Sequence, residues 1–144
     1  MKSGTRKKVA SSMSDLLLDT CAMLWLAEGI ELTADARKAA TDNKLNVSPI
    51  SVWEIANLVR KNRVVLAMPV AKWFRQTMGV MAAAMCELTV DILANSCELP
   101  GLPPSDPADR ILIATAREAS MVLMTRDKQI LAYSAAGYVR TVVC

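Results

Sequence analysis

Residues 15–27 read DLLLDTCAMLWLA, and this stretch decides the fold. The segment 15–18 contains a short apolar run and suits a buried β-strand. Residues 20–27 then predict a helix, and Gly29 lies close to its end. A buried strand that leads directly into a helix is typical of α/β proteins, in which a parallel sheet is covered on both faces.

The rest of the chain continues this alternation of strands and helices. Further strands are predicted at 45–47, 87–90, 121–124 and 138–142. Further helices are predicted at 34–40, 49–61, 69–85, 110–119 and 129–134, with a short one from residue 91. The alternation predicts one three-layer α/β/α domain over residues 15–144, with a central, mostly parallel sheet of four or five strands. Residues 1–14 are polar and basic, and we expect them to form a disordered extension.

The composition limits where the protein acts. Although 53% of the 144 residues are hydrophobic, no apolar run reaches the roughly 18 residues that span a bilayer. We therefore expect no membrane segment, and we assign the apolar surplus to buried elements and to an oligomer interface. The four cysteines form no CxxC pair, which predicts reduced, structural thiols and a cytoplasmic location.

The chain contains no histidine. This excludes Ser-His-Asp and Cys-His catalysis, and it also excludes metal sites with histidine ligands. If the protein is an enzyme, carboxylates and a hard metal ion are its leading means of catalysis.

Four acidic residues each adjoin an apolar run, namely Asp19, Glu54, Asp109 and Asp127. An ionised carboxylate beside core segments needs a cation, a hydrogen-bond donor or a metal ion. Asp19 follows the first predicted strand and Asp127 follows the strand at 121–124. Because ligands bind beyond the carboxyl ends of parallel strands, we expect these acids to meet in one metal-binding site.

Each acid also has a local explanation. Asp19 can cap the helix that begins at Thr20, Asp127 can be an ordinary turn residue, and Glu54 can pair with Arg60 or Lys61 at the surface. In the D-x-x-D motif, Asp106 is expected to cap the helix that starts at Pro107 and to be mainly structural. Asp109, in the first turn of that helix, is then the expected ligand.

The net charge of +3 is too small to indicate nucleic acid by itself. Arg60, Lys61 and Arg63 form one basic cluster, and Lys72 and Arg75 form another. Solvated helix faces explain each cluster, although both would attract a polyanion if the site handles phosphodiesters.

Four segments taken together resemble the PIN-domain ribonucleases, and among them the VapC-like toxins of toxin–antitoxin pairs. The segments are LLLDTCAMLWL (16–26), VSPISVWEIANLVRKNRV (47–64), LPPSDPADRILIATARE (102–118) and LMTRDKQIL (123–131). The resemblance covers residues 15 to about 131. There are departures, because Cys21 and the Pro104-Ser105 stretch stand where many relatives have histidine, and Ala108 replaces an aromatic residue.

The resemblance implies a PIN-like fold and a metal-dependent endoribonuclease that hydrolyses RNA phosphodiesters. It implies Mg²⁺ or Mn²⁺ as the cofactor, a small antitoxin protein as partner, and a homodimer. Asp19 and Asp109 would be the most direct ligands, Asp127 would bind directly or through water, and Glu54 would hold a water or a second metal ion. The matching acids are Asp19, Glu54, Asp109 and Asp127, and the supporting hydroxyls are Thr20, Ser51 and Thr125.

Other functions remain open at this point. In a non-catalytic α/β binding module the acids would only cap helices. In a receiver-like domain a single aspartate after a strand would accept a phosphoryl group. A nuclease of the same fold that serves nucleic-acid processing or repair would differ from a toxin in its substrate only.

Overall fold

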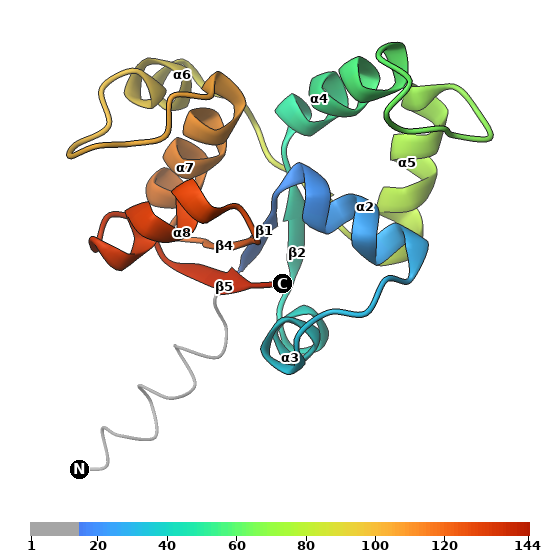
Figure 1. The fold of residues 1–144 in the computed structure, drawn as a ribbon, viewed down its shortest axis with the longest axis horizontal. Coiled ribbons are helices and arrows are strands. Elements are labelled where there is room, and N and C mark those ends of the chain that lie inside the picture. The colour runs from blue at the N-terminus through green and yellow to red at the C-terminus, as the bar shows by residue number, and fades with distance from the viewer. Residues whose placement is uncertain (1–14) are drawn as a thin grey trace.

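A computed structural model describes residues 15–144, so the predicted extension at 1–14 lies outside the described residues. The strands are β1 (Leu16–Leu18), β2 (Leu45–Val47), β3 (Ala84–Met85), β4 (Val122–Thr125) and β5 (Thr141–Val143). They form one sheet in the order β3-β2-β1-β4-β5, and every neighbouring pair is parallel (Figure 1). The predicted parallel sheet of four or five strands is confirmed.

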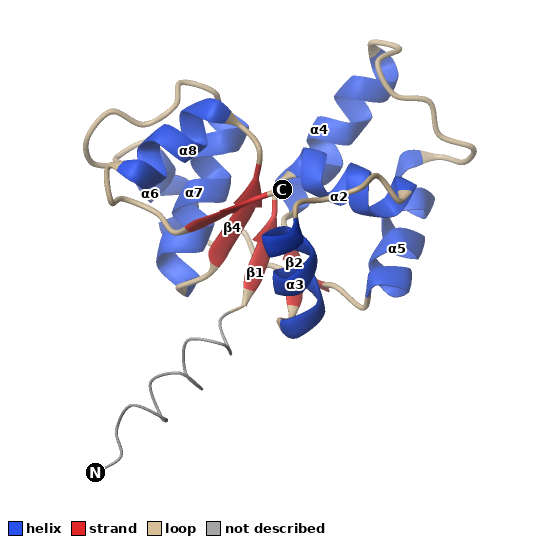
Figure 2. Cartoon of the chain, turned by 60° about the horizontal axis from the view of Figure 1, so that its bottom comes forward, coloured by secondary structure: helices blue, strands red, loops and turns tan. Residues whose placement is uncertain are grey.

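Helices cover both faces of this sheet (Figure 2). One face packs against the first four helices and the other against α7 (Pro107–Ala119) and α8 (Lys128–Ala135), while α6 (Val90–Ser96) packs on α7. Between residues 15 and 144 the chain has no helix with the length and apolar character needed to cross a membrane. The helices are α2 (Thr20–Glu28), α3 (Ala34–Asp42), α4 (Pro49–Arg60), α5 (Val70–Met81), α6 (Val90–Ser96), α7 (Pro107–Ala119) and α8 (Lys128–Ala135).

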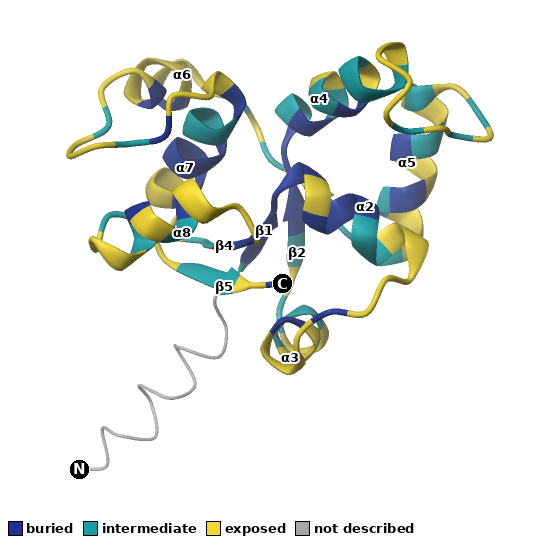
Figure 3. Ribbon diagram, viewed as in Figure 1, coloured by how far each residue is buried: buried dark blue, intermediate teal, exposed yellow. Residues whose placement is uncertain are grey.

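The central strand β1 is buried on both faces (Figure 3). Leu16 and Leu18 belong to the hydrophobic cluster under α2–α5, whereas Leu17 belongs to the cluster under α7 and α8. Because successive side chains of a strand point to opposite faces, three consecutive leucines serve two cores. This explains why the strand is an unbroken apolar run rather than an alternating one.

Capping residues determine where most of the helices begin. Asp19 caps α2, Thr33 caps α3, and Ser48 caps α4 with proline in the first turn. The helix α2 ends at Gly29, whose φ of 71° lies in the left-handed region that glycine adopts without strain. The helices that the sequence predicted from these signals are confirmed, with boundaries that differ by a few residues.

Two predictions between residues 69 and 90 were wrong. The helix predicted to run to residue 85 ends at Met81, because Ala82 takes a left-handed conformation with φ of 55°. The strand predicted at 87–90 is instead Ala84–Met85, which pairs with β2 at the edge of the sheet. Alanine favours helices, so the pairing with β2 overrides the local propensity of this segment.

Replacing a leucine in the central strand should destabilise the protein strongly. Leu17 is 0% exposed, and a buried Leu→Ala change costs roughly 2–5 kcal/mol of unfolding free energy. Leu102 is 94% exposed, so Leu102→Ala makes the same chemical change outside the core. Urea denaturation should show a large loss for Leu17→Ala and a change within about 0.5 kcal/mol for Leu102→Ala. Equal losses in the two variants would contradict this assignment of the core.

Candidate functional site

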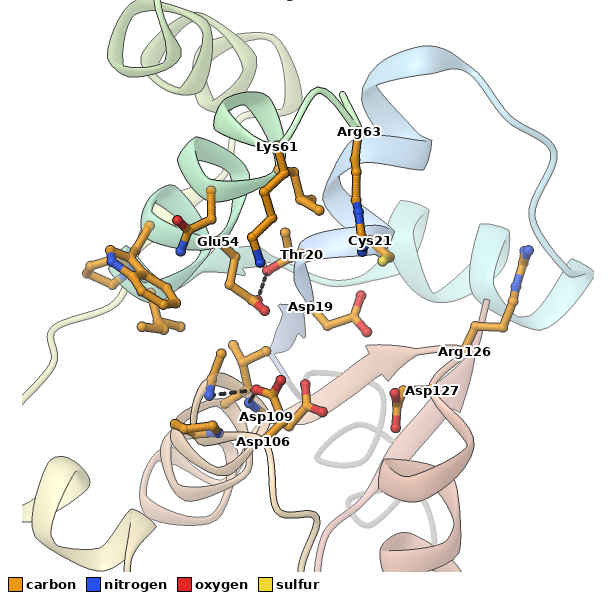
Figure 4. A pocket seen from close by; sticks show the side chains of 18 of the residues that line it. Asp19, Thr20, Cys21, Glu54, Lys61, Arg63, Asp106, Asp109, Arg126 and Asp127 are labelled. Atoms are coloured by element: carbon orange, nitrogen blue, oxygen red, sulfur yellow. Dashed lines mark hydrogen bonds between the residues drawn. The ribbon is translucent and has the colours of Figure 1, made fainter. Parts of the chain in front are cut away.

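A cavity of about 980 Å³ lies at the carboxyl edge of the sheet. Asp19 follows β1, Glu54 lies on α4, Asp109 lies in the first turn of α7, and Asp127 follows β4. All four acids line this cavity (Figure 4), and we refer to them as the acid quartet. The strands β1 and β4 are neighbours in the sheet, so their carboxyl ends bring Asp19 and Asp127 to one place.

Asp19 is 6% exposed, and neutral donors hold its carboxylate. Its Oδ1 accepts a hydrogen bond of 2.7 Å from the backbone N–H of Ala22, which is the cap of α2. Its Oδ2 accepts one of 2.6 Å from the hydroxyl of Thr125. Burial raises the pKa of Asp19, the bonds from Thr125 and Ala22 oppose that rise, and the charge of Asp127 adds to it. Asp19 is therefore both the N-cap of α2 and a lining residue of the cavity.

Two hydroxyls connect Glu54 to the first helix. The Thr20 hydroxyl donates a hydrogen bond to Glu54 Oε1, and Thr20 Oγ1 lies 2.9 Å from Ser51 Oγ. A threonine hydroxyl has one proton, so we assign Ser51 as the donor in the second bond. Burial raises the pKa of Glu54, while the bond from Thr20 lowers it. The structure thus places Thr20 and Ser51 beside the quartet and fixes the orientation of Glu54.

The alternative ion pair of Glu54 with Arg60 or Lys61 does not form. The ion pairs within residues 15–144 join Arg37 to Glu31 and Lys38 to Asp42, all on or near α3. Arg60 instead donates to the side-chain oxygen of Asn57. No basic side chain in residues 15–144 therefore forms an ion pair with a carboxylate of the quartet.

Asp109 has the most perturbed acidity of the quartet. Burial is the largest cause, followed by the charges of Asp106, Asp127, Glu54 and Asp19, and together they raise its pKa to about 7. Four other acids add to this shift because nearby negative charges disfavour the ionised form of the carboxyl. The arrangement stores unfavourable charge that a cation would relieve.

The role expected of Asp106 was only partly correct. It caps α7, since its Oδ1 accepts from the backbone N–H groups of Ala108 and Asp109 at 2.8 and 3.1 Å. It also lines the cavity and is the main charge that raises the pKa of Asp109. The sequence shows the capping pattern but not the direction of the exposed carboxylate.

Asp127 is exposed and caps α8, since its Oδ1 accepts a hydrogen bond of 2.9 Å from Ile130 N–H. Its own N–H donates to the Thr125 hydroxyl at 3.0 Å. The buried Thr125 thus contacts two members of the quartet, because the same hydroxyl donates to Asp19. Asp127 is therefore both the turn residue that caps α8 and an acid of the cavity.

The quartet fits a hard divalent ion held by few direct ligands. Its donors are carboxylate oxygens, which Mg²⁺ and Mn²⁺ prefer, and the burial of Asp19 makes its charge costly without a cation. No three Asp, Glu, Cys or His side chains in residues 15–144 lie close enough together to hold a metal ion as placed. A closed cage is therefore not formed, whereas Mg²⁺ usually keeps several waters and binds one or two carboxylates.

Cys21 also lines the cavity. Burial, aided by the charges of Asp19 and Glu54, raises its pKa to about 11. Its environment therefore disfavours the thiolate, which is the nucleophilic form of cysteine.

Sequence reasoning missed several other side chains of the cavity. Trp53 is 62% exposed and precedes Glu54, and Trp25 and Arg126 contact each other at the cavity wall. Arg126 was detectable in principle, because it lies between Thr125 and Asp127. Nothing in the sequence pairs it with Trp25, which is a hundred residues away.

The raised pKa of Asp109 makes the stability of the metal-free protein depend on pH. Between the ordinary pKa of 3.8 and about 7, the folded state binds more protons than the unfolded state. The unfolding free energy therefore falls as the pH rises through this window. Asp109→Asn should be more stable than the wild type at pH 8, and the difference should shrink toward pH 4.

Denaturation in EDTA at several pH values measures this effect. Asp91→Asn is a matched control, because Asp91 is an exposed acid in the first turn of α6. Its curve should follow the wild type. If the Asp109→Asn curve also runs parallel to the wild type, the pKa of Asp109 is not raised in the folded protein.

Comparison with known proteins identifies the family. Residues 16–136 match the PIN domain family. Over 120 residues the chain is 35% identical to Ribonuclease VapC22 of Mycobacterium tuberculosis, covering 82% of this chain and 91% of that protein. The fold resembles that of DNA-bound VapBC from Salmonella typhimurium, with 15% identity, a TM-score of 0.61, and coverage of 91% and 98%. It also resembles VapBC2 from Rickettsia felis bound to a promoter DNA fragment, with 12% identity, a TM-score of 0.60, and coverage of 89% and 97%. The chain therefore belongs to the PIN domain family, as its motifs indicated.

Proposed function

We propose that this protein is a divalent-metal-dependent endoribonuclease that hydrolyses RNA phosphodiesters as the toxin of a toxin–antitoxin pair. The observation that carries the proposal is the acid quartet, which lines one cavity in a chain 35% identical to a VapC ribonuclease. Membership of the PIN domain family also sets the receiver-like alternative aside.

Asp19 and Asp109 are the proposed direct ligands of Mg²⁺ or Mn²⁺, with Asp127 and Glu54 binding directly or through water. The support is their common cavity, the burial of Asp19 and the mutual repulsion of the carboxylates. When bound, the ion supplies positive charge that offsets the charge of the phosphate and makes a water more acidic.

The chain's own residues prepare the cavity for this chemistry. Asp19 is held in one orientation by Thr125 and Ala22, so its oxygens need no rearrangement when substrate arrives. Thr20 does the same for Glu54. The apolar side chains of Ile50 and Leu112 line the same cavity and lower the local dielectric, which strengthens the electrostatic interactions within it.

The proposal includes a small antitoxin protein and a second copy of the chain as partners. The support is the 35% identity to Ribonuclease VapC22 and the fold shared with proteins solved as VapBC complexes. The four cysteines are free, which suits the reducing cytoplasm where we place the protein.

A cleavage assay tests the nuclease directly. Purified protein should cut a fluorophore-labelled single-stranded RNA with Mg²⁺ or Mn²⁺, and EDTA should stop the reaction. Asp19→Asn and Asp109→Asn remove charge from the proposed metal site and should lower the rate by roughly 100-fold or more. Asp91→Asn, on the exposed face of α6, should retain wild-type activity. Full activity in EDTA would overturn the metal mechanism.

Metal binding can be tested without any substrate. Mn²⁺ at 100 times its dissociation constant should raise the unfolding free energy by about 2.7 kcal/mol. Calorimetric titration and thermal denaturation of the wild type should show this effect, and Asp19→Asn should lose it. A protein that binds no ion at millimolar concentration would instead be a non-catalytic binding module.

A further inference from the structure

Two contacts hold the side chain of Arg126 at the wall of the cavity. Its Nε–H donates a hydrogen bond of 2.8 Å to the backbone oxygen of Cys144. Its Cζ lies 4.1 Å from the centroid of the Trp25 ring, a cation–π contact between the turn after β4 and helix α2. An exposed arginine is ordinarily free to adopt many rotamers, so these two contacts restrict it to one position.

The contacts leave the outer end of the guanidinium available. An arginine has five N–H donors, and the bond to Cys144 uses only the one on Nε. In the described residues, the two Nη groups donate no hydrogen bond, and Arg126 forms no ion pair with a carboxylate. Four donors in a planar fork are therefore unused in a side chain that lines the same cavity as Asp19 and Asp127.

The position of this fork suits a phosphate on a polyanion. Lys61 and Arg63 line the same cavity from the end of α4, and in Figure 4 Asp19 lies between Lys61 and Arg126. Positive groups thus stand on two sides of the acidic centre. A chain of phosphates that crosses the quartet would meet a cation on each side, whereas an isolated anion would use only one of them.

We propose that Arg126 binds a backbone phosphate next to the scissile phosphate of the RNA, and that Trp25 positions Arg126 for this contact. The inference rests on the proposed ribonuclease function and adds to it a residue outside the acid quartet. A planar guanidinium can make two parallel hydrogen bonds to one phosphate, which a lysine cannot. Because the contact is to the backbone, it should be independent of base sequence.

A purely structural role is the competing explanation for Arg126. Through its bond to Cys144 and its stacking on Trp25, the side chain could simply fasten the last residue of the chain to α2. That role predicts a loss of thermal stability in the variants and no specific effect on RNA. The two roles are therefore separable by measuring RNA affinity, its salt dependence and the kinetic constants in the same variants.

The first experiment measures binding of a fluorescein-labelled single-stranded RNA in EDTA, at several NaCl concentrations, by fluorescence anisotropy. Arg126→Gln should raise the dissociation constant roughly tenfold, as expected for one lost charge-assisted contact. The slope of log affinity against log salt should become shallower by about 0.7, the value for one phosphate on a single strand. In Mg²⁺, KM for cleavage should rise by the same factor with kcat nearly unchanged.

Two further variants separate charge, geometry and general electrostatics. Arg126→Lys keeps the charge, so it should retain the salt slope while losing affinity because the fork is absent. Arg117→Gln is a matched control, because Arg117 is an exposed arginine that donates to the backbone oxygen of Tyr138 and lines a different cavity. It removes the same charge and should leave RNA affinity and the salt slope unchanged.

Trp25 is tested through its dependence on Arg126. Trp25→Leu removes the aromatic face and should raise KM, whereas Trp25→Phe keeps a ring and should restore most of the affinity. In the Arg126→Gln background, Trp25→Leu should add nothing to KM, because the residue acts only through the arginine. Thermal denaturation of each variant identifies any general loss of folding, and Trp25→Phe keeps the test valid if the leucine variant is unstable.

The outcomes distinguish this inference from the proposed function. If the wild type cleaves RNA and Arg126→Gln has unchanged KM, affinity and salt slope, the phosphate contact does not exist although the protein is a ribonuclease. A fall in melting temperature without a change in these quantities would assign Arg126 the structural role. If the wild type neither binds nor cleaves RNA under any of these conditions, both proposals are wrong.

Discussion

The carboxylate of Asp19 is buried at the end of the central strand, where a charged group is tolerated only if donors reach it. One donor is the N–H of Ala22 in the first turn of α2, and the other is the hydroxyl of Thr125 at the end of β4. The backbone N–H of Asp19 also bonds to Met124 O at 3.1 Å, continuing the ladder between β1 and β4. The pairing of β1 with β4 therefore also determines how Asp19 is placed in the cavity. A shift in strand register would remove the donor and expose the wrong leucines at the same time.

Much of the fold was predictable because its signals are local. The strand at 45–47 and the helix that begins at Pro49 are marked by an apolar run and by a serine cap followed by proline. The segment around residues 82–90 was not predictable in this way. Alanines there favour a helix, yet Ala82 ends α5 in a left-handed conformation and Ala84–Met85 pairs as an edge strand. Pairing with a strand forty residues earlier carries no local signal.

The candidate site was likewise predictable only where its signals are local in the sequence. Acids that follow strands or open helices can be found from the sequence, because topology places those positions at one edge of the sheet. Asp106 was harder to interpret, since its capping role is complete without any cavity. The contact between Trp25 and Arg126 depends on the return of β4 and on the position of Cys144 at the chain end. Such pairings exist only in three dimensions, and the residue types alone do not reveal them.

The strand order has a further consequence for folding. Strand β1 lies in the middle of the sheet, and its neighbour β4 follows it by more than a hundred residues in the sequence. A loop of that length must close before the Thr125 hydroxyl reaches Asp19, and contacts between distant residues form slowly. Until β4 pairs, Asp19 lies at the end of an unpaired strand edge, without the hydroxyl that orients it. The complete cavity therefore depends on one of the most non-local steps of folding, so a change that slows the pairing of β1 with β4 delays the site as well as the sheet.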